Sequence, residues 1–433
     1  MSMTVKWSAV AGVMGLCLAL GVTVSVPVQA AEQDAVSEQQ SQLPLEELRL
    51  FTEVFQRIKS AYVEPVSDAK LLEDALRGML AGLDPHSTYL VEEEFANLQE
   101  HTSGEFGGLG IEVGMEDGFV RVIAPIDDTP AQRAGVKAGD LITKLGDRAV
   151  QGMDLNEAIG LMRGKPGTTL LLTIIREGEE KPLEIEVERA VIQVASVKSR
   201  LLDNEYGYLR ITQFQVDTGK ELNRQLEKLT AEASLKGLIL DLRNNPGGVL
   251  QAAVEVSDAF LTEGLIVYTE GRLDEAKHEF RATSKTTIGD IPVVVLINGG
   301  SASASEIVAG ALQDQKRAVI MGQDSFGKGS VQTILPLSKD RALKLTTARY
   351  FTPSGRSIQA QGILPDIRVE DAELKLREAQ PEFIKERELS GHLENGSSKP
   401  QKQANKDSKA LASKDYLLYE ALGLLKALVI IQR

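Results

Sequence analysis

The chain has 433 residues, of which 42% are hydrophobic and only 5% are aromatic, and this is enough apolar material for two or three packed domains. Its formal net charge of −14, with no basic stripe in the sequence, argues against nucleic acid and anionic lipid as partners. The four histidines are scattered and the only cysteine is Cys17, so the sequence predicts no metal, no cofactor and no disulfide.

Residues 1–31 have the pattern of an export signal. Lys6 is the only charge before Glu32, an apolar run follows it, and Val28-Gln-Ala30 fits a small-residue cleavage site. The run is also long enough for an uncleaved membrane anchor. We therefore expect a periplasmic protein whose leader is removed, with membrane association through a retained leader as the alternative.

Residues 32–103 are predicted to form an N-terminal helical region after a polar start. Apolar residues recur at three- and four-residue spacing, which is typical of an amphipathic helix: Leu48, Phe51, Val54, Phe55 and Ile58. A second helix is predicted over 71–83 and a third over 92–101. The sequence Asp84-Pro-His-Ser-Thr88 predicts a turn between them.

Residues 104–190 are predicted to form a small β domain. Glycines crowd the segment Gly104-Glu-Phe-Gly-Gly-Leu-Gly-Ile111, short β patterns follow, and one helix is expected over 154–162. Amides of the glycine-rich loop can converge on a free carboxylate, and the strand edge at 111–113 can accept an extended peptide. The alternative is a small β domain without a ligand.

Residues 191–377 are predicted to form a layered α/β core. Strands are expected at 206–211, 237–242, 293–297, 318–321 and 342–347, and helices at 219–231, 250–259 and 305–314. The polar segment 378–409 is predicted to be a linker. Residues 410–433 are predicted to form a helical tail that ends in a strand-like run, Val429-Ile-Ile431, and that either packs on the core or makes contacts in a homo-oligomer. The predicted fold class is thus a multidomain α/β (α+β) protein.

Three small hydroxyl residues, Ser301, Ser303 and Ser305, follow the apolar strand over 291–297. Ser303 lies where a strand ends and a helix begins, a position that exposes a hydroxyl and directs the first helical amides at a developing anion. The N–H of Ala304 is then one candidate oxyanion donor. The alternative is a helix cap, because Ser303 and Glu306 have capping-box spacing.

Lys328 lies between two glycines, 25 positions after Ser303. A partly buried lysine has a lowered pKa and can act as the general base for a serine. Gln332 is placed to orient this lysine. The alternatives are a solvated lysine, or the S-x-x-K motif of penicillin-interacting acyl enzymes at Ser325-Phe-Gly-Lys328, although the flanking glycines disfavour the helix which that motif needs.

A second glycine turn, Asp241-Leu-Arg-Asn-Asn-Pro-Gly-Gly248, follows the strand over 237–240. Its amides can face a cleft, so either Gly247 or Gly248 is the candidate for the second oxyanion donor. The sequence leaves the choice between them open.

The combination resembles the C-terminal processing peptidases, also called tail-specific proteases. The resemblance rests on Gly82-Leu-Asp-Pro-His-Ser87, Phe106-Gly-Gly-Leu-Gly-Ile111, Asp241 to Gly248, Gly300-Ser-Ala-Ser-Ala-Ser-Glu306 and Phe326-Gly-Lys-Gly329, in this order. It implies a Ser/Lys dyad in which Ser303 is the nucleophile, Lys328 the general base and Gln332 the residue that orients the lysine. It also implies that 104–190 is a PDZ domain that binds a peptide through Gly107, Gly108, Leu109, Gly110 and Ile111.

The family resemblance implies an exported serine endopeptidase that recognises the C-terminal tails of envelope proteins, with peptidoglycan hydrolases among the candidate substrates. The segment Arg163-Gly-Lys-Pro-Gly167 resembles one that, in some members, signals ligand binding to the active site. Some members also need an adaptor lipoprotein with helical repeats, which is a candidate partner here. The alternative from another class is a catalytically silent PDZ scaffold.

Overall fold

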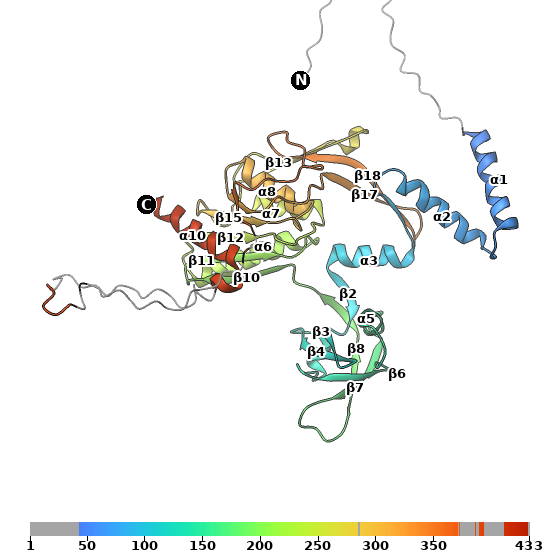
Figure 1. The fold of residues 1–433 in the computed structure, drawn as a ribbon, viewed down its shortest axis with the longest axis horizontal. Coiled ribbons are helices and arrows are strands. Elements are labelled where there is room, and N and C mark those ends of the chain that lie inside the picture. The colour runs from blue at the N-terminus through green and yellow to red at the C-terminus, as the bar shows by residue number, and fades with distance from the viewer. Residues whose placement is uncertain are drawn as a thin grey trace, which may run out of the picture. The chain divides into compact units, whose positions relative to one another are not determined.

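The computed structural model describes residues 43–284, 286–370, 372, 386, 389–393 and 411–431 (Figure 1). The predicted leader and almost all of the predicted linker lie outside these residues. The chain divides into two compact units, Met1–Leu71 and Leu72–Arg433. Within the described part of the chain, no helix is long and apolar enough to cross a membrane.

The described part of the first unit is helical. It contains α1 (Leu45–Ala61) and the beginning of α2 (Asp68–Ala81). Glu46 and Glu47 lie in the first turn of α1, where negative charge is favourable, and none of its residues is buried. Both helices were predicted from the sequence, and α2 begins three residues before its predicted start.

The second unit continues with a turn, the short strand β1 (Thr88–Leu90) and α3 (Glu92–Ser103). The turn is closed by the Asp84 carboxylate, which accepts hydrogen bonds from the N–H groups of His86 (2.8 Å) and Ser87 (2.9 Å). The sequence did not predict β1. It forms because it pairs with β18 (Ala342–Phe351), more than 250 positions along the chain, in an antiparallel register that places Thr88 opposite Lys344.

The small β domain contains one sheet and a buried apolar core. The strands of the sheet are β3 (Ile111–Glu116), β4 (Phe119–Pro125), β5 (Leu141–Leu145), β7 (Thr169–Ile175) and β8 (Leu183–Glu188), with β6 (Arg148–Ala149) paired to β5. The domain also holds the short helix α4 (Pro130–Arg133) and α5 (Leu155–Met162), and the Asp154 carboxylate caps α5 by accepting the Glu157 N–H. Both ends of the domain lie in a two-stranded ribbon of β2 (Glu105–Gly108) and β9 (Ala190–Gln193).

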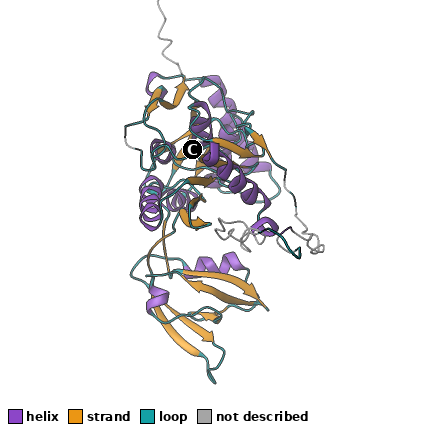
Figure 2. Ribbon diagram, turned by 90° about the vertical axis from the view of Figure 1, so that its left-hand side faces the viewer, coloured by secondary structure: helices purple, strands orange, loops and turns teal. Residues whose placement is uncertain are grey.

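In the predicted α/β core, helices lie around the strands (Figure 2). The core is built on a six-stranded sheet. Its order is β10 (Val197–Leu202), β11 (Tyr206–Ile211), β12 (Gly237–Asp241), β15 (Val293–Ile297), β16 (Val319–Gly322) and β19 (Ile367–Arg368). All neighbours in this sheet are parallel except β10 and β11. Side chains of a strand point alternately to the two faces, so Leu238 and Leu240 face one apolar cluster and Ile239 faces another.

Helices cover both faces of this sheet. One face packs against α6 (Thr218–Glu232), α7 (Leu250–Asp258) and α8 (Ala304–Asp314), and the other packs against the C-terminal helix α10 (Tyr416–Ile431). The predicted strand-like run at the end of the chain is wrong, because Val429, Ile430 and Ile431 continue α10. Helical periodicity from Leu417 onward, reinforced by packing on the sheet, outweighs the β preference of three apolar residues.

A second, antiparallel sheet completes the core. It contains β13 (Leu265–Gly271), β14 (His278–Arg281), β17 (Ser330–Pro336), β18 and β1, and a short 3-10 helix, η1 (Asp274–Ala276), lies between β13 and β14. Strand β17 begins soon after β16 of the first sheet, so the loop over 323–329 passes from one sheet to the other. The two sheets together position the loop that carries Lys328.

We predict that α10 stabilises the core through its own packing. Leu418 is fully buried between the helix and the sheet, so Leu418→Ala should lower the free energy of unfolding by about 2–5 kcal/mol. The midpoint of thermal unfolding of the full chain measures this loss. The matched control is Ile430→Ala, at a position that is 67% exposed, where little change is expected. A shift in oligomer mass without a lower midpoint would instead support a tail that only joins subunits.

Candidate functional site

Three loops meet at one edge of the parallel sheet. They follow the carboxyl ends of β12, β15 and β16 and cover residues 242–248, 298–303 and 323–329. Parallel α/β sheets place their ligand sites at this edge. Together with β17 and β18, the loops line a cavity of about 440 Å³ that contains all the predicted catalytic and oxyanion residues: Gly247, Gly248, Ser303, Ala304, Lys328 and Gln332.

The three clustered serines have different surroundings. The Ser301 hydroxyl is fully buried and donates to the Leu242 carbonyl (2.8 Å), and the Ser305 hydroxyl is fully buried and donates to the Asn245 carbonyl (2.9 Å). The hydroxyl of Ser303 donates to no carbonyl among the described residues, and Ser303 alone of the three lines the cavity. Geometry therefore separates Ser303 from its neighbours, which the sequence by itself did not.

The backbone at Ser303 adopts an uncommon conformation. Its φ is 57° and its ψ is −114°, although it is not a glycine. Residues held in such regions cost about 1–3 kcal/mol and are concentrated at functional sites. The sharp turn between the 298–303 loop and α8 resembles the strained strand-to-helix elbow that exposes a nucleophilic serine.

The predicted oxyanion donors are not equivalent. The N–H of Gly247 donates to the Asn245 side chain (2.9 Å) and is already occupied. In the described part of the chain, the N–H groups of Gly248 and Ala304 have no acceptor, and both residues line the cavity. A side chain at Gly247 would come within 2.7 Å of the Ser303 Cβ, so this position needs glycine for space. The pair with free N–H groups is Gly248 and Ala304.

A fully buried carboxylate connects the serine and lysine loops. Glu306 is fully buried, and one of its oxygens accepts hydrogen bonds from the N–H groups of Ser303 (2.7 Å) and Lys328 (2.9 Å). The other oxygen accepts hydrogen bonds from the Ser325 hydroxyl (2.5 Å) and the Gly327 N–H (2.6 Å). The capping role that its spacing suggested is therefore present in part, since Glu306 does satisfy the Ser303 N–H. The same carboxylate also fixes the loop that carries Lys328.

Lys328 is half-buried, and its pKa is lowered from the ordinary lysine value. The largest cause is burial, and the nearby charge of Lys344 acts in the same direction. The carboxylates of Asp84 and Glu306 act against this change. Among the described residues, no hydrogen bond or ion pair holds the Lys328 ammonium group. At a given pH, a larger fraction of Lys328 is therefore neutral than of a solvated lysine.

Gln332 lies in the same cavity but does not contact Lys328 in this structure. Its side-chain amide donates to the Ser330 hydroxyl (2.9 Å) and more weakly to the Thr346 hydroxyl (3.4 Å). Ser325, the serine of the alternative S-x-x-K motif, lies in a non-helical loop where its hydroxyl donates to Glu306 and accepts the Ile363 N–H. This arrangement does not fit the helical turn which that motif requires.

Two cavity residues on β18 were missed by sequence reasoning. Lys344 and Tyr350 both line the cavity, on either side of a register shift in the β17–β18 pairing that interrupts the alternation of side chains. The Tyr350 hydroxyl donates to the Lys328 carbonyl, and burial raises the pKa of Tyr350 above its ordinary value. No local signal pointed to these two residues, because nothing in the sequence shows that β18 faces the serine loop.

The small β domain has its own groove. A cavity of about 210 Å³ is lined by Gly108, Leu109, Gly110, Ile111 and Arg163, together with apolar side chains from β2, β3 and α5: Phe106, Val113, Ile159 and Met162. Within the described residues, the N–H groups of Leu109 and Gly110 have no acceptor. Gly107 does not line the groove, because it is paired in the β2–β9 ribbon and packs closely against Gly164.

Arg163, at the end of α5, connects this domain with α3. Its guanidinium forms an ion pair with Glu100 (2.8 Å) and lies 4.9 Å from the centre of the Phe106 ring. Its Nε atom is buried and has no partner among the described residues. Because Leu98 and Thr102 of α3 line the Ser303 cavity, Arg163 lies on a continuous path of contacts between the two cavities.

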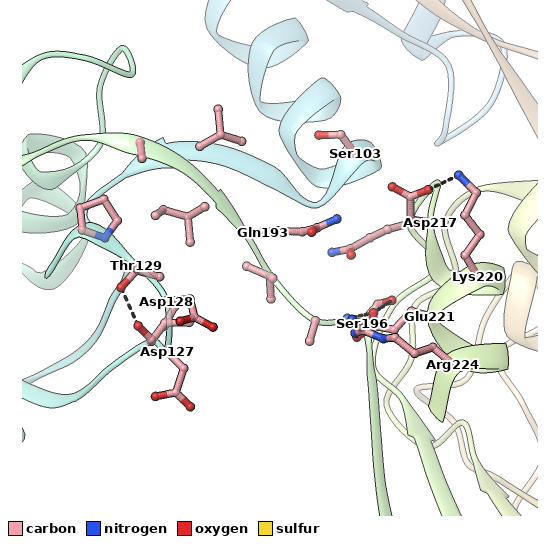
Figure 3. A pocket seen from close by; sticks show the side chains of 18 of the residues that line it. Ser103, Asp127, Asp128, Thr129, Gln193, Ser196, Asp217, Lys220, Glu221 and Arg224 are labelled. Atoms are coloured by element: carbon pink, nitrogen blue, oxygen red, sulfur yellow. Dashed lines mark hydrogen bonds and ion pairs between the residues drawn. The ribbon is translucent and has the colours of Figure 1, made fainter. Parts of the chain in front are cut away.

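A third and larger cavity of about 720 Å³ lies away from these residues (Figure 3). It is lined by an acidic loop of the small β domain, by the connection after β9 and by the first turns of α6. The polar groups of this cavity satisfy one another locally, as in the Lys220–Asp217 ion pair (2.7 Å) and the Ser196–Thr218 hydrogen bond (2.8 Å). Its size exceeds that of the Ser303 cavity, but it contains no comparable pair of nucleophile and base.

Comparison with protein families matches three parts of the chain. Residues 205–369 match peptidase family S41, and residues 107–187 match a PDZ domain. Residues 14–94 match the N-terminal domain of the activating protease CtpB. The predicted fold class, a PDZ domain joined to a layered α/β protease core, is confirmed by these matches.

Three similar proteins carry the same kind of name. A carboxy-terminal-processing protease of Bartonella bacilliformis is 47% identical over 86% of this chain and 86% of its own length. The carboxy-terminal processing protease CtpA of Bacillus subtilis is 37% identical over 73% of this chain and 67% of its own. A carboxyl-terminal-processing protease of a Synechocystis species is 38% identical over 72% of this chain and 74% of its own. The chain therefore belongs to the carboxy-terminal-processing proteases of peptidase family S41 and is a serine-type endopeptidase.

Proposed function

We propose that this protease is exported to the periplasm, binds the free C-terminal tails of envelope proteins through its PDZ domain, and cleaves them with a Ser303/Lys328 dyad. One observation carries the catalytic part of the proposal. Ser303 and Lys328 line one cavity together with two unpaired N–H groups, whereas the neighbouring hydroxyls of Ser301 and Ser305 are committed to main-chain carbonyls.

In the first half of the reaction, neutral Lys328 accepts the proton of the Ser303 hydroxyl as its oxygen attacks the carbonyl carbon of the substrate peptide bond. The carbonyl oxygen gains the negative charge, and the N–H groups of Gly248 and Ala304 stabilise it. When the C–N bond breaks, protonated Lys328 returns its proton to the leaving amine. The products are a free amine and an acyl ester on Ser303.

In the second half, water attacks the ester carbonyl while Lys328 accepts a proton from it. The tetrahedral intermediate expels the Ser303 oxygen, which takes the proton back from the lysine. The carboxylate product leaves, and the dyad returns to its initial state. The lysine must be neutral at the start of both halves, so burial of Lys328 supports this role by lowering its pKa.

The PDZ groove supports recognition of a free C-terminus. The unpaired N–H groups of Leu109 and Gly110 can donate to a terminal carboxylate, and apolar side chains such as Ile159 and Met162 can bury the last residue of the tail. The Arg163–Glu100 ion pair supports transmission of this binding event to α3, which borders the catalytic cavity.

The remaining parts of the proposal rest on the sequence. The pattern of residues 1–31 supports export. The sequence resemblance supports envelope substrates such as peptidoglycan hydrolases and a helical-repeat adaptor, and the apolar pattern of the C-terminal tail supports a homo-oligomer. Fractionation of cells expressing the full chain tests the compartment, and recovery in the cytosol would contradict it. Substrates trapped on the Ser303→Ala variant and identified by mass spectrometry would name the targets and any adaptor.

We predict that Ser303→Ala abolishes cleavage of an unstructured protein substrate and leaves the fold intact. The loss should exceed about 1,000-fold, because the variant lacks the nucleophile of the proposed dyad. Turnover is measured by gel electrophoresis of the substrate, and the fold by circular dichroism. The matched control is Ser305→Ala, which removes a buried hydrogen bond and should reduce stability while keeping turnover. Turnover by purified Ser303→Ala would contradict the dyad.

We predict that Glu306→Gln lowers both stability and activity. Glutamine offers a single carbonyl oxygen, so two of the four donors around this position would face an NH₂ group instead of an acceptor. A buried donor without an acceptor costs about 1–3 kcal/mol each, and the thermal midpoint measures the loss. Glu263→Gln, at an exposed position, is the control. Wild-type stability and turnover in Glu306→Gln would refute this connecting role.

We predict that the PDZ groove distinguishes a free C-terminus from a blocked one. A fluorescent peptide with a terminal carboxylate should bind the full-length Ser303→Ala variant about ten times more tightly than the same peptide with a terminal amide. The reason is that the amide lacks the charge which the Leu109 and Gly110 N–H groups would bind. Fluorescence anisotropy measures both affinities. Equal affinities would exclude carboxylate recognition and leave the catalytic assignment unaffected.

A further inference from the structure

We propose that Asp84, in the turn between α2 and β1, is a positioning residue for the catalytic lysine. Through Thr346 it anchors Gln332, and together with Lys344 it sets the charge balance around Lys328. This inference rests on the proposed dyad and adds to it Asp84 and Lys344, two residues far apart in the sequence for which the sequence suggested no part in the reaction.

Asp84 is connected to the cavity by a chain of hydrogen bonds. One of its oxygens accepts the Thr346 hydroxyl (3.1 Å), and the other accepts the Ser87 hydroxyl (2.7 Å). The Ser87 hydroxyl in turn accepts the Thr346 N–H (3.1 Å). Thr346 is therefore held on both its side chain and its main chain, and its position depends on the Asp84 turn.

Thr346 in turn orients the side chain of Gln332. The two residues are directly opposite each other in the β17–β18 pairing, and the Gln332 amide donates to the Thr346 hydroxyl (3.4 Å) and to the Ser330 hydroxyl (2.9 Å). Because both hydroxyls accept hydrogen bonds from the NH₂ group of Gln332, the carbonyl oxygen of this side chain is left available. That oxygen has no donor among the described residues and can accept a hydrogen bond from the Lys328 amine.

Titratable groups from three parts of the chain surround Lys328. They are Asp84 and His86 in the turn before β1, Glu306 in α8, and Lys344 on β18, and the buried hydroxyl of Tyr350 on β18 lies against the Lys328 main chain. Burial and the charges of Lys328 and Lys344 lower the pKa of His86, so His86 is neutral over a wider pH range than usual. Besides Glu306, the charges of Asp84 and Lys344 act on Lys328.

The charges of Asp84 and Lys344 change the pKa of Lys328 in opposite directions. Asp84 favours the protonated form of Lys328 and raises its pKa, whereas Lys344 disfavours that form and lowers it. Because the neutral form is the base, the rate rises as pH increases through the pKa of Lys328. Removing the Asp84 charge should therefore move this rise to lower pH, and removing the Lys344 charge should move it to higher pH.

Pairing of β1 with β18 explains how the arrangement forms. Thr88 lies opposite Lys344, so the turn that precedes β1 is beside Thr346, two residues further along β18. Lys344 and Thr346 are two residues apart in a regularly paired part of β18, so their side chains share one face of the strand. A single register thus brings the acidic turn, the lysine of β18 and the Gln332 amide together.

The test compares pH profiles of kcat/KM for an unstructured protein substrate in the full chain. Each kcat/KM value is divided by the plateau value of the same variant. On the acid side, this normalised kcat/KM should be about threefold higher than wild type in Asp84→Asn and about threefold lower in Lys344→Gln. The matched controls are Asp340→Asn and Lys339→Gln, which remove the same charges from exposed positions in the turn between β17 and β18. These two controls should follow the wild-type profile.

A second pair of variants separates the hydrogen bonds from the charge. Thr346→Val removes the link between Asp84 and Gln332 and should lower the plateau several-fold, while Thr346→Ser keeps the hydroxyl and should restore it. Thr346→Val changes no charge and should leave the acid limb near its wild-type position. If Asp84→Asn fails to fold, Lys344→Gln still tests the charge by its shift to higher pH, and Asp84→Glu, which keeps the charge, should keep the wild-type acid limb.

The outcomes separate this proposal from the dyad itself. Acid limbs that are unchanged in both charge variants, or that move in the same direction, would overturn the role of Asp84 and Lys344 while Ser303→Ala is still inactive. Turnover by Ser303→Ala would overturn the dyad and this inference with it. Opposite shifts with unchanged controls would support the assignment, since a purely structural role lowers the plateau without moving the limb.

Discussion

The site depends on one buried carboxylate. Glu306 is fully buried, and burying an ionised carboxylate costs several kcal/mol unless its oxygens are hydrogen-bonded. Its four donors come from two loops that follow different strands, at Ser303 on one side and at Ser325, Gly327 and Lys328 on the other. The desolvation cost is offset only when both loops are in place. The serine and the lysine are therefore assembled together, and the uncommon backbone of Ser303 is held by the same contacts.

This arrangement creates a conflict that the surroundings resolve. A carboxylate close to Lys328 favours the protonated amine, whereas the proposed mechanism needs the neutral amine as its base. The Glu306 oxygens, however, are already engaged by N–H and O–H donors, which offset part of the negative charge. Burial of the lysine and the charge of Lys344 then outweigh Glu306 and Asp84, so the pKa of Lys328 falls below its ordinary value. The same carboxylate can thus fix the base without keeping it protonated.

Local patterns in the sequence predicted most of the elements around the site. Amphipathic spacing gave α1 and α6, and continuous apolar runs gave β12 and β15. The glycine-rich motifs, together with the family resemblance, made Ser303 and Lys328 the candidates for the dyad. Contacts between distant segments were not predictable, because no local pattern encodes a pairing partner. The proposed role of Asp84 depends on the β1–β18 register. The proposed choice of Gly248 over Gly247 depends on the Asn245 side chain, which occupies the Gly247 N–H and leaves that of Gly248 free.

The loop over 242–248 is held in place in a way that supports the proposed role of the free Gly248 N–H. The Arg243 guanidinium, early in this loop, is fixed between Asp241 (2.6 Å) and Asp415 (2.7 Å), and Asp415 directly precedes α10. Further along, the Asn245 amide donates to the Ile211 carbonyl (2.9 Å). The loop is therefore oriented by folding, and no reorganisation is needed when charge develops on the substrate oxygen. A donor held in advance stabilises a transition state more than one that must first be ordered. The C-terminal helix contributes to this orientation although it lies on the opposite face of the sheet from α8.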